Sequence, residues 1–167
     1  MKSYPIKHVV GGVELSIRPK PSKVSLEEAK IFYSSQGLSL MEPAGSSLTC
    51  YGLMENKPLK PAQLLSVVGV HSSWRYHSVL GLFDIPTSVI SNSVLVGGVI
   101  TDANRRHEGH GIKLMEYVMS EHPVICLRVK ADNHPALGMY RKLGFIEQRS
   151  PMTTGSMWMF YVPTVSR

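Results

Sequence analysis

The stretch Val94-Leu95-Val96-Gly97-Gly98-Val99-Ile100-Thr101 ends at Asp102, and Arg106-His107-Glu108-Gly109-His110-Gly111 then leads into an amphipathic run. This order predicts a strand, a turn and a helix. Gly109 and Gly111 lack a Cβ atom, so backbone N–H groups of the turn can approach a ligand at the positive end of the helix dipole. Such a turn suits a pyrophosphate. On the turn alone, plain packing of the helix on the strand explains the glycines equally well.

A second motif follows the apolar segment 124–129 and contains Asn133, Tyr140 and Leu143-Gly144-Phe145. Together the two motifs resemble the GNAT superfamily of N-acetyltransferases. The first matches its acetyl-CoA signature, which is arginine or glutamine, two residues, glycine, one residue, and glycine or alanine. The second matches its asparagine, its tyrosine and its terminal Leu-Gly-Phe. The resemblance is specific over residues 94–145, and upstream of it only the order of elements is compatible.

The resemblance implies an α/β (α+β) fold, in which a mixed central sheet of about six to seven strands carries helices on both faces. The length of 167 residues is enough for one ordinary domain with its own core. No Gly/Ser-rich or Pro-rich tract separates regions of different composition. We therefore expect residues 1–167 to form a single GNAT-like, acyl-CoA-binding domain.

Local patterns place the remaining elements. An opening strand is expected to end at Pro19 and Pro21, and Ser25 with Glu28 forms a capping box for a helix that stops at Gly37. The segments 38–47 and 74–93 have weak patterns and are candidates for short elements or functional loops. The expected strands are 9–17, 48–54, 64–71, 94–101, 124–129, 145–147 and 157–162, and the later helices are 109–120 and the one that follows Asn133.

The resemblance implies that the turn at residues 106–111 binds acetyl-CoA (CoA). Its backbone N–H groups and the helix dipole would hold the pyrophosphate, and Arg106 would add a positive side chain. We expect the side chains of His107, Glu108 and His110 to face solvent while their backbone atoms contact the cofactor.

The resemblance also implies that two central parallel strands separate and admit the pantetheine arm along the backbone of residues 99–101. An N–H group of this edge would also stabilise negative charge on the thioester oxygen. Asn133 would contact the pantetheine amides, unless its side chain only caps its helix. The expected cofactor-binding residues are Val99, Ile100, Thr101, Arg106, His107, Glu108, Gly109, His110, Gly111, Ile112, Asn133 and Tyr140.

Tyr140 is the expected catalytic residue, because the resemblance places its hydroxyl within reach of the sulfur, where it would protonate the leaving thiolate. Without the motif, a tyrosine near Leu137 and Leu143 would be read as a core residue. The general base is not identified, since residues 94–101 contain no carboxylate. The remaining candidates are His71, His77, Asp84 and Asp102, and the alternative is that the substrate binds as free amine through ordered water.

Composition limits the function only loosely. The net charge of +6 suits a phosphate-rich cofactor, an acidic partner or nucleic acid equally well. The basic residues are scattered, and their one concentration flanks the expected cofactor turn. Nucleic-acid binding rests on net charge alone and is disfavoured, because basic and aromatic residues are not interleaved. The local concentration consists of Arg105, Arg106, Arg128, Lys130, Arg141 and Lys142.

Cys50 and Cys126 fit no zinc or redox spacing, which favours free thiols in a reducing compartment. The first residues do not resemble a secretory leader, and no apolar run reaches membrane-spanning length. A cytoplasmic protein without a membrane partner is therefore expected. The run from His107 to His110 misses the HExxH spacing by one position, so no metal site is expected.

Taken together, the sequence favours an acyltransferase that passes an acetyl group from acetyl-CoA directly to a primary amine in a ternary complex. The acceptor stays open between a small amino compound, a peptide amino terminus and a protein lysine. The alternative is a catalytically weak or inactive GNAT-like module that binds CoA or acyl-CoA and acts through protein contact. Either a monomer or a homodimer is compatible with the sequence.

Overall fold

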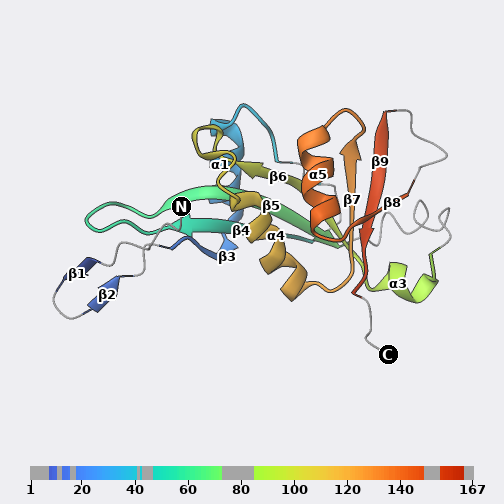
Figure 1. Ribbon diagram of the computed structural model, residues 1–167, viewed down its shortest axis with the longest axis horizontal. Coiled ribbons are helices and arrows are strands. Elements are labelled where there is room, and N and C mark those ends of the chain that lie inside the picture. The colour runs from blue at the N-terminus through green and yellow to red at the C-terminus, as the bar shows by residue number, and fades with distance from the viewer. Residues whose placement is uncertain are drawn as a thin grey trace.

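The computed structural model describes residues 8–10, 13–15, 18–40, 42, 47–72, 85–148 and 155–163. Seven strands form one mixed sheet in the order β3-β4-β5-β6-β7-β9-β8, and β1 and β2 pair separately (Figure 1). Among the strands that the structure describes, β6 and β7 are the only parallel neighbours. The strands are β1 (His8–Val10), β2 (Val13–Leu15), β3 (Lys20–Val24), β4 (Leu48–Glu55), β5 (Gln63–Ser72), β6 (Val94–Thr101), β7 (Ile125–Lys130), β8 (Ile146–Gln148) and β9 (Ser156–Tyr161).

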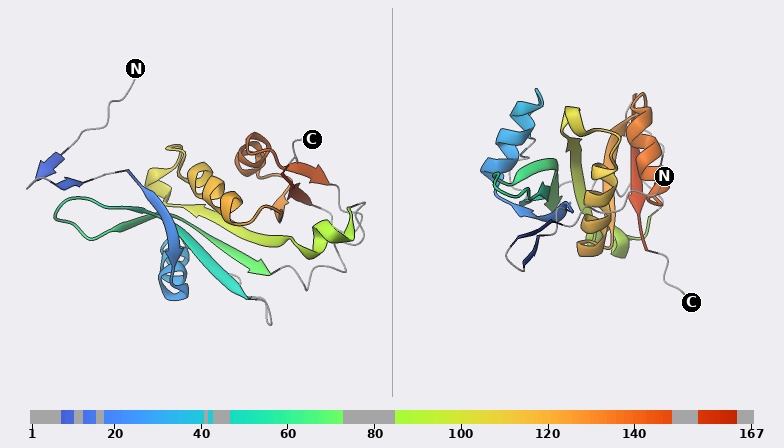
Figure 2. Two further views of the ribbon diagram at one scale, coloured as in Figure 1. Left: turned by 90° about the horizontal axis from the view of Figure 1, so that it is seen from below. Right: turned by 60° about the vertical axis from the view of Figure 1, so that its left-hand side comes forward.

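Helices cover both faces of this sheet. Helix α1 packs on one face, and α4 and α5 pack on the other (Figure 2). A mixed seven-stranded sheet with helices on both faces confirms the predicted fold class. The helices are α1 (Leu26–Ser35), α3 (Thr87–Ser91), the 3-10 helix η2 (Ala103–Arg105), α4 (His110–Glu121) and α5 (His134–Lys142).

Successive side chains of a strand point to opposite faces of the sheet, so the core has a layer on each face. On β7, Ile125 and Leu127 face the core under α4 and α5, while Cys126 faces the opposite side with Trp158. Leu114, Met115 and Val118 of α4 are fully buried against this sheet face. Each such side chain contributes about 1.5–3 kcal/mol through its burial, so α4 is held firmly in place. No helix in the described ranges combines the length and the apolar character that a membrane crossing needs.

Local sequence signals fix the helix ends as expected. The Ser25 hydroxyl accepts a hydrogen bond from the Glu28 N–H (3.1 Å), and the Glu28 carboxylate accepts one from the Ser25 N–H (2.8 Å). Asn133 caps α5 through the Ala136 N–H. Gly37 and Gly144 follow their helices with φ of 71° and 88°, the left-handed conformation that glycine adopts without strain.

The amino-terminal part differs from the prediction of one strand over residues 9–17 that ends at the prolines. The chain forms β1 and β2 there, and β3 begins at Lys20 and contains Pro21. Because β3 is an edge strand that pairs only with β4, the missing N–H of Pro21 can face outward without breaking a ladder. In the segment 74–93 the structure describes α3, and residues 73–84 lie outside the described ranges.

Candidate functional site

The parallel strands β6 and β7 separate partway along their length. They pair only from Val94 opposite Ile125 to Val96 opposite Leu127. Beyond Val96, β6 continues to Thr101 with pairing only to β5 on its other side. One edge of this part of β6 is therefore free of strand partners among the described residues, and it faces the gap toward β7.

A β-bulge marks the point of separation. Gly97 pairs with Gly69 and Ile100 with Val67, so Gly98 and Val99 together lie opposite one residue of β5. Gly98 has a φ of 41°, which disfavours any residue with a Cβ atom. The bulge turns the backbone of β6 away from a regular ladder at the place where the gap opens.

The predicted residues Val99, Ile100 and Thr101 lie along this free edge. Val99 packs toward the core under α4 and α5, and Ile100 packs toward the core under α1. The Ser66 hydroxyl donates to the Ile100 carbonyl (2.8 Å) and contacts the Thr101 hydroxyl (3.1 Å). The side chains of Val99 and Ile100 thus serve the core, and the Thr101 hydroxyl contacts Ser66. The edge of this segment away from β5 faces the gap.

The loop before α4 has an alternating backbone. His107 has a φ of 66° and Gly109 a φ of 80°, with no positive φ at Glu108 between them. Alternation of this kind turns successive N–H groups toward one side, the arrangement that forms an anion-binding nest. An added Cβ on Gly109 would meet no atom within 4 Å, so the space beside this residue is open.

Helix α4 starts without a side-chain cap, and no acidic residue lies in its first turn. Helices α1 and α5 are capped by Ser25 and Asn133. Among the helices of eight or more residues that the structure describes, α4 is the one whose first N–H groups lack a side-chain acceptor. Its N-terminus therefore keeps the donors and the dipole that an anion needs.

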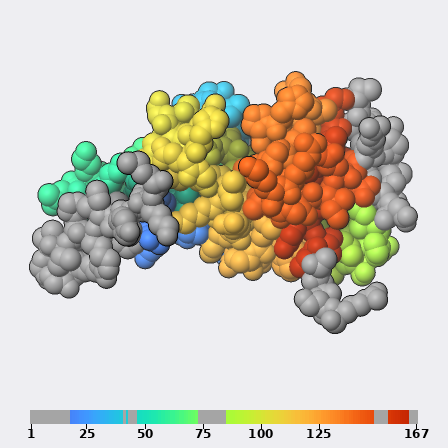
Figure 3. All heavy atoms as spheres, viewed as in Figure 1, coloured from blue at the N-terminus to red at the C-terminus, as the bar shows by residue number. Residues whose placement is uncertain are grey.

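The second glycine of the motif has a different role. A Cβ on Gly111 would lie 3.3 Å from the Met139 sulfur and 3.5 Å from the Thr101 hydroxyl oxygen. Gly111 thus allows α4, β6 and α5 to pack closely, and the start of α4 and α5 lie side by side in the space-filling view (Figure 3). Of the two alternatives weighed from the sequence, open backbone applies at Gly109 and close packing at Gly111.

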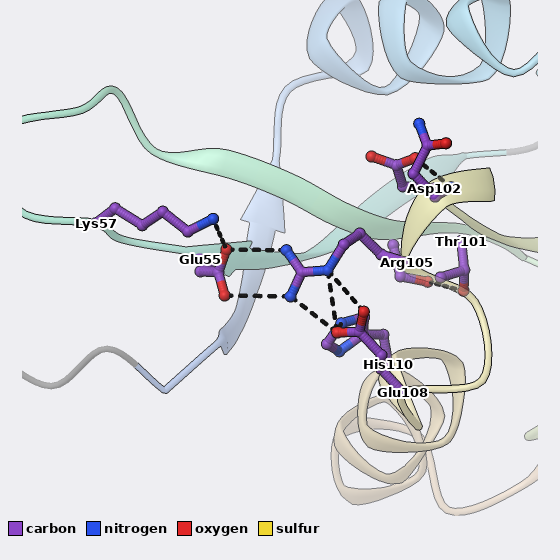
Figure 4. A network of polar contacts seen from close by, with 9 residues as sticks. Glu55, Lys57, Thr101, Asp102, Arg105, Glu108 and His110 are labelled. Atoms are coloured by element: carbon purple, nitrogen blue, oxygen red, sulfur yellow. Dashed lines mark hydrogen bonds and ion pairs between the residues drawn. The ribbon is translucent and has the colours of Figure 1, made fainter. Parts of the chain in front are cut away.

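A charged network ties the loop to the sheet. The Arg105 guanidinium lies between Glu55 of β4 and Glu108 of the loop (Figure 4). Its Nε donates to both Glu108 oxygens (2.9 and 3.0 Å), and its Nη1 donates to Glu55 (3.1 Å). Lys57 also pairs with Glu55, at 2.9 Å. The network anchors the loop to β4 independently of any ligand.

This network also sets the charge on both carboxylates. Hydrogen bonds from Arg105, then from Lys57, lower the pKa of the buried Glu55 from 4.5 to about 2. The same guanidinium lowers the pKa of Glu108, with His110 adding a smaller effect. Glu108 is therefore ionised, and its charge is directed to Arg105 and His110 rather than to the open side of the loop.

The expectation for His110 was wrong. Its side chain is buried at 8% exposure, and its Nε2 lies 3.0 Å from the Glu108 carboxylate. The reason is that His110 is the first residue of α4, where its ring packs back over the loop. His107 is exposed as expected, and Glu108 is exposed but ion-paired. Arg106 is exposed at the rim of the loop, and Ile112 is half-buried in the first turn of α4.

Tyr140 lies in the core under α4 and α5, at 5% exposure and 5.4 Å from the ring of Phe145 between centroids. Burial raises the pKa of its phenol well above the usual value, so the hydroxyl keeps its proton. Burial thus keeps the phenol in the protonated form that a proton donor requires, and it also makes the phenol a weaker acid.

Tyr33 is a site residue that sequence reasoning missed. From α1 on the opposite face, its hydroxyl donates a hydrogen bond to the Gly98 carbonyl at the bulge. Burial raises its pKa, and the Cys50 thiol and the Tyr140 phenol add to the effect. Tyr33 and Tyr140 therefore belong to core clusters on opposite faces of the sheet, and the Tyr33 hydroxyl reaches the bulge. The pair Gly97-Gly98 inside an apolar strand was the available signal for a bulge.

The structure describes two of the four candidates for a general base, Asp102 and His71. Asp102 accepts a hydrogen bond from the Asn104 N–H (3.0 Å) and so caps η2. His71 is buried on β5 beside Gly97. His77 and Asp84 lie outside the described residues.

The Asn133 side-chain oxygen is engaged as the cap of α5. The described residues contain no group of three or more His, Cys, Asp or Glu that could hold a metal ion.

Known structures with this fold include acetyltransferases. Arabidopsis thaliana NAA60 in complex with acetyl-CoA superposes with a TM-score of 0.67 at 14% identity, over 86% of this chain and 98% of that one. The ribosomal-protein-S18-alanine N-acetyltransferase from Escherichia coli gives 0.57 at 14% identity, over 86% and 92%. A chain of the NatC complex bound to Gag peptide and CoA gives 0.56 at 16% identity, over 89% and 99%. No protein-family model and no curated protein matches the sequence. The likeness confirms the predicted GNAT-like fold.

Proposed function

We propose that this chain is an N-acetyltransferase that passes an acetyl group from acetyl-CoA to a primary amine by direct attack in a ternary complex. The uncapped N-terminus of α4, next to the point where β6 and β7 separate, is the observation that carries the proposal. It joins an anion-binding end to a free strand edge in one continuous site. In this proposal residues 1–167 form a single acyl-CoA-binding domain.

The residues present fit acetyl-CoA. The N–H groups of Gly111 and Ile112 and the open side of Gly109 would hold the diphosphate, with Arg106 at the rim. The free edge at Val99, Ile100 and Thr101 offers backbone groups to the amide-bearing pantetheine arm. Acetyl-CoA would supply an activated acyl group as a thioester.

In this proposal, the Arg105 network prepares the loop for phosphate binding. Glu108 places a negative charge within a loop proposed to bind phosphates, which by itself would repel them. Arg105 and His110 engage its oxygens and Arg105 also anchors the loop to Glu55. The chain therefore holds its loop amides in position before the ligand arrives, which lowers the ordering cost of binding.

Proton transfer is assigned to Tyr140. Its buried, protonated hydroxyl would donate a proton to the thiol sulfur as the C–S bond breaks. Asn133 and His107 have weaker support, because the Asn133 oxygen caps α5 and the His107 side chain is exposed. We keep His107, Glu108 and His110 as residues that contribute backbone groups to the cofactor site.

The acceptor amine is the open part of the proposal. The name of the Escherichia coli protein refers to an alanine of a ribosomal protein, and the NatC structure contains a peptide. Peptides with a free amino terminus therefore belong in a substrate panel beside lysine peptides and small amines. Thiol release from acetyl-CoA with each acceptor measures the reaction.

The same panel separates the enzyme from the alternative, a CoA-binding module that acts through protein contact. Calorimetry with CoA and a thiol-release assay with acetyl-CoA are run on one preparation. Binding together with amine-dependent thiol release supports the enzyme. Binding without thiol release from any acceptor supports the module, and absence of binding contradicts both.

A matched pair of variants tests the anion site itself. Asp and Asn tolerate the left-handed conformation of Gly109, and no atom lies within 4 Å of the added Cβ. Gly109→Asp places a negative charge beside the free N–H groups, whereas Gly109→Asn places a neutral amide there. We expect CoA to bind the Asp variant about tenfold or more weakly than the Asn variant, from repulsion at short range. Equal affinities of the two variants would place the diphosphate elsewhere.

A further inference from the structure

His71 occupies an unusual position on β5. Its imidazole lies over the backbone of the paired residues Gly69 and Gly97, with Nε2 3.6 Å and 3.2 Å from the positions that their Cβ atoms would take. The side chain is buried at 1% exposure. Gly97 is the first residue of β6 beyond its pairing with β7, so the ring lies beside the separation point.

Packing alone does not explain a histidine here. Its Nδ1 is buried and has no hydrogen-bond partner among the described residues. A buried polar atom without a partner costs about 1–3 kcal/mol, and an aliphatic or aromatic side chain would fill the space without that cost. The absence of a Cβ at Gly97 leaves just the room that the ring needs. A polar group kept at such a cost indicates a use for its lone pair or its proton.

The side chains near His71 indicate whether it acts on the leaving sulfur or on the incoming amine. The Tyr33 hydroxyl bonds to the Gly98 carbonyl on the same sheet face, while Tyr140 approaches from the face of α4 and α5. If Tyr140 serves the leaving sulfur, the opposite face is the one left for the incoming amine. His71 and Tyr33 are the polar side chains that the structure places at the bulge on that face.

We propose that His71 accepts the proton that the acceptor ammonium must lose before its nitrogen attacks the acetyl carbon. The inference rests on the proposed acetyl transfer. A neutral ring nitrogen takes one proton from the ammonium, which frees the nitrogen lone pair. The N–C bond then forms and the C–S bond breaks, and the second proton lost by nitrogen balances the one gained by sulfur through Tyr140. The imidazolium returns its proton to solvent.

The charge state of His71 suits this role. Burial lowers its pKa below the usual 6.5, so the ring is neutral at pH 7. The titratable groups on the same face include Tyr33 of α1, Cys50 of β4 and Cys126 of β7, and burial raises the pKa of all three, so all three are neutral. The charged pair on this side, Lys30 with Glu42, is exposed. No charged side chain among the described residues therefore favours the protonated form of the His71 ring.

The first test compares two kinds of acceptor amine. A lysine-type ammonium has a pKa of about 10.4 and an α-ammonium about 7.8, so the first depends more on a proton acceptor. His71→Gln should lower turnover with a lysine-type amine by about 10²-fold, and with an α-amine by less. His122→Gln is the matched control, because His122 is a half-buried histidine bonded to Tyr51 away from the bulge. Equal losses for both amines in His71→Gln, or no loss, would overturn the proposal.

A second readout needs no turnover. The imidazole signals of His71 are titrated by NMR in the free protein and again with a conjugate that joins CoA to an alkylamine through an acetyl linker. We expect a free-protein midpoint below pH 6.5, and a shift of the His71 signals but not those of His122 when the conjugate binds. If the conjugate binds and His71 does not respond, the proposal fails while the acetyltransferase function stands. If the conjugate does not bind, the proposed function itself fails. Wild-type titration also decides the case if His71→Gln does not fold.

Discussion

The ion pair between Arg105 and Glu55, which anchors the loop before α4 to the sheet, can be tested by measuring protein stability as the pH is lowered. Glu55→Gln keeps the shape of a side chain that is 7% exposed and removes its charge. In the wild type, the Glu55 carboxylate binds Arg105 and Lys57, and its pKa falls from 4.5 to about 2. Because the folded pKa lies below the unfolded value, the stabilisation is complete above the unfolded pKa and is lost as the pH falls toward the folded one.

The size of the effect follows from these two values. Linkage between a pKa of 4.5 unfolded and about 2 folded removes about 0.8 kcal/mol of stability between pH 7 and pH 4. By pH 3 the loss attributable to Glu55 reaches about 2 kcal/mol. The Gln variant has no carboxylate to protonate, so its free energy of unfolding should fall less over the same interval by these amounts.

Urea unfolding at several pH values, followed by the fluorescence of the buried Trp158, measures the difference. Glu147→Gln is the control, since it removes a carboxylate whose ion pair with Arg141 lies at the surface. The reasoning is refuted if the wild type and Glu55→Gln lose stability in parallel from pH 7 to pH 3. Parallel curves would mean that Arg105 does not bind Glu55 in solution and that the loop is anchored otherwise.

Two further substitutions address Tyr140 and Tyr33. Tyr140→Phe should lower kcat about 10²-fold, with CoA affinity within about twofold of wild type, since only the proton donor is lost; calorimetry and thiol release check this, and a large loss of affinity would contradict it. Tyr33→Phe should lower the free energy of unfolding by about 1–3 kcal/mol, because the partly buried Gly98 carbonyl loses its donor. Chemical denaturation measures this second loss, and an unchanged midpoint would exclude a positioning role for Tyr33.

Much of the fold was predictable because local signals and tertiary contacts agree. Ser25 and Glu28 form the capping box that their spacing predicts, and Asn133 caps its helix in the same way. The glycine at position 109 takes the positive φ that the turn requires. In each case, a residue's own hydrogen bonds or backbone freedom decides the conformation, so sequence alone is informative.

Other features depend on partners distant in the chain. Pro21 predicts the end of a strand, yet it lies inside β3, because whether a proline is tolerated depends on edge position in the sheet. His110 differs at short range, since it was expected in solvent and is buried because its ring packs back over the loop and contacts Glu108, two residues before it. The contact of Tyr33 with Gly98 joins residues 65 positions apart, which no local pattern encodes.

Amide NMR during a titration with CoA tests the central claim most directly, because it reports on each N–H group of the loop and of the free strand edge. The account predicts that the amides of Gly109, Gly111 and Ile112 shift together with those of residues 98–101. It is contradicted if these amides stay unchanged while others respond, such as those of Val89 and Phe160, which line an apolar groove beside α3.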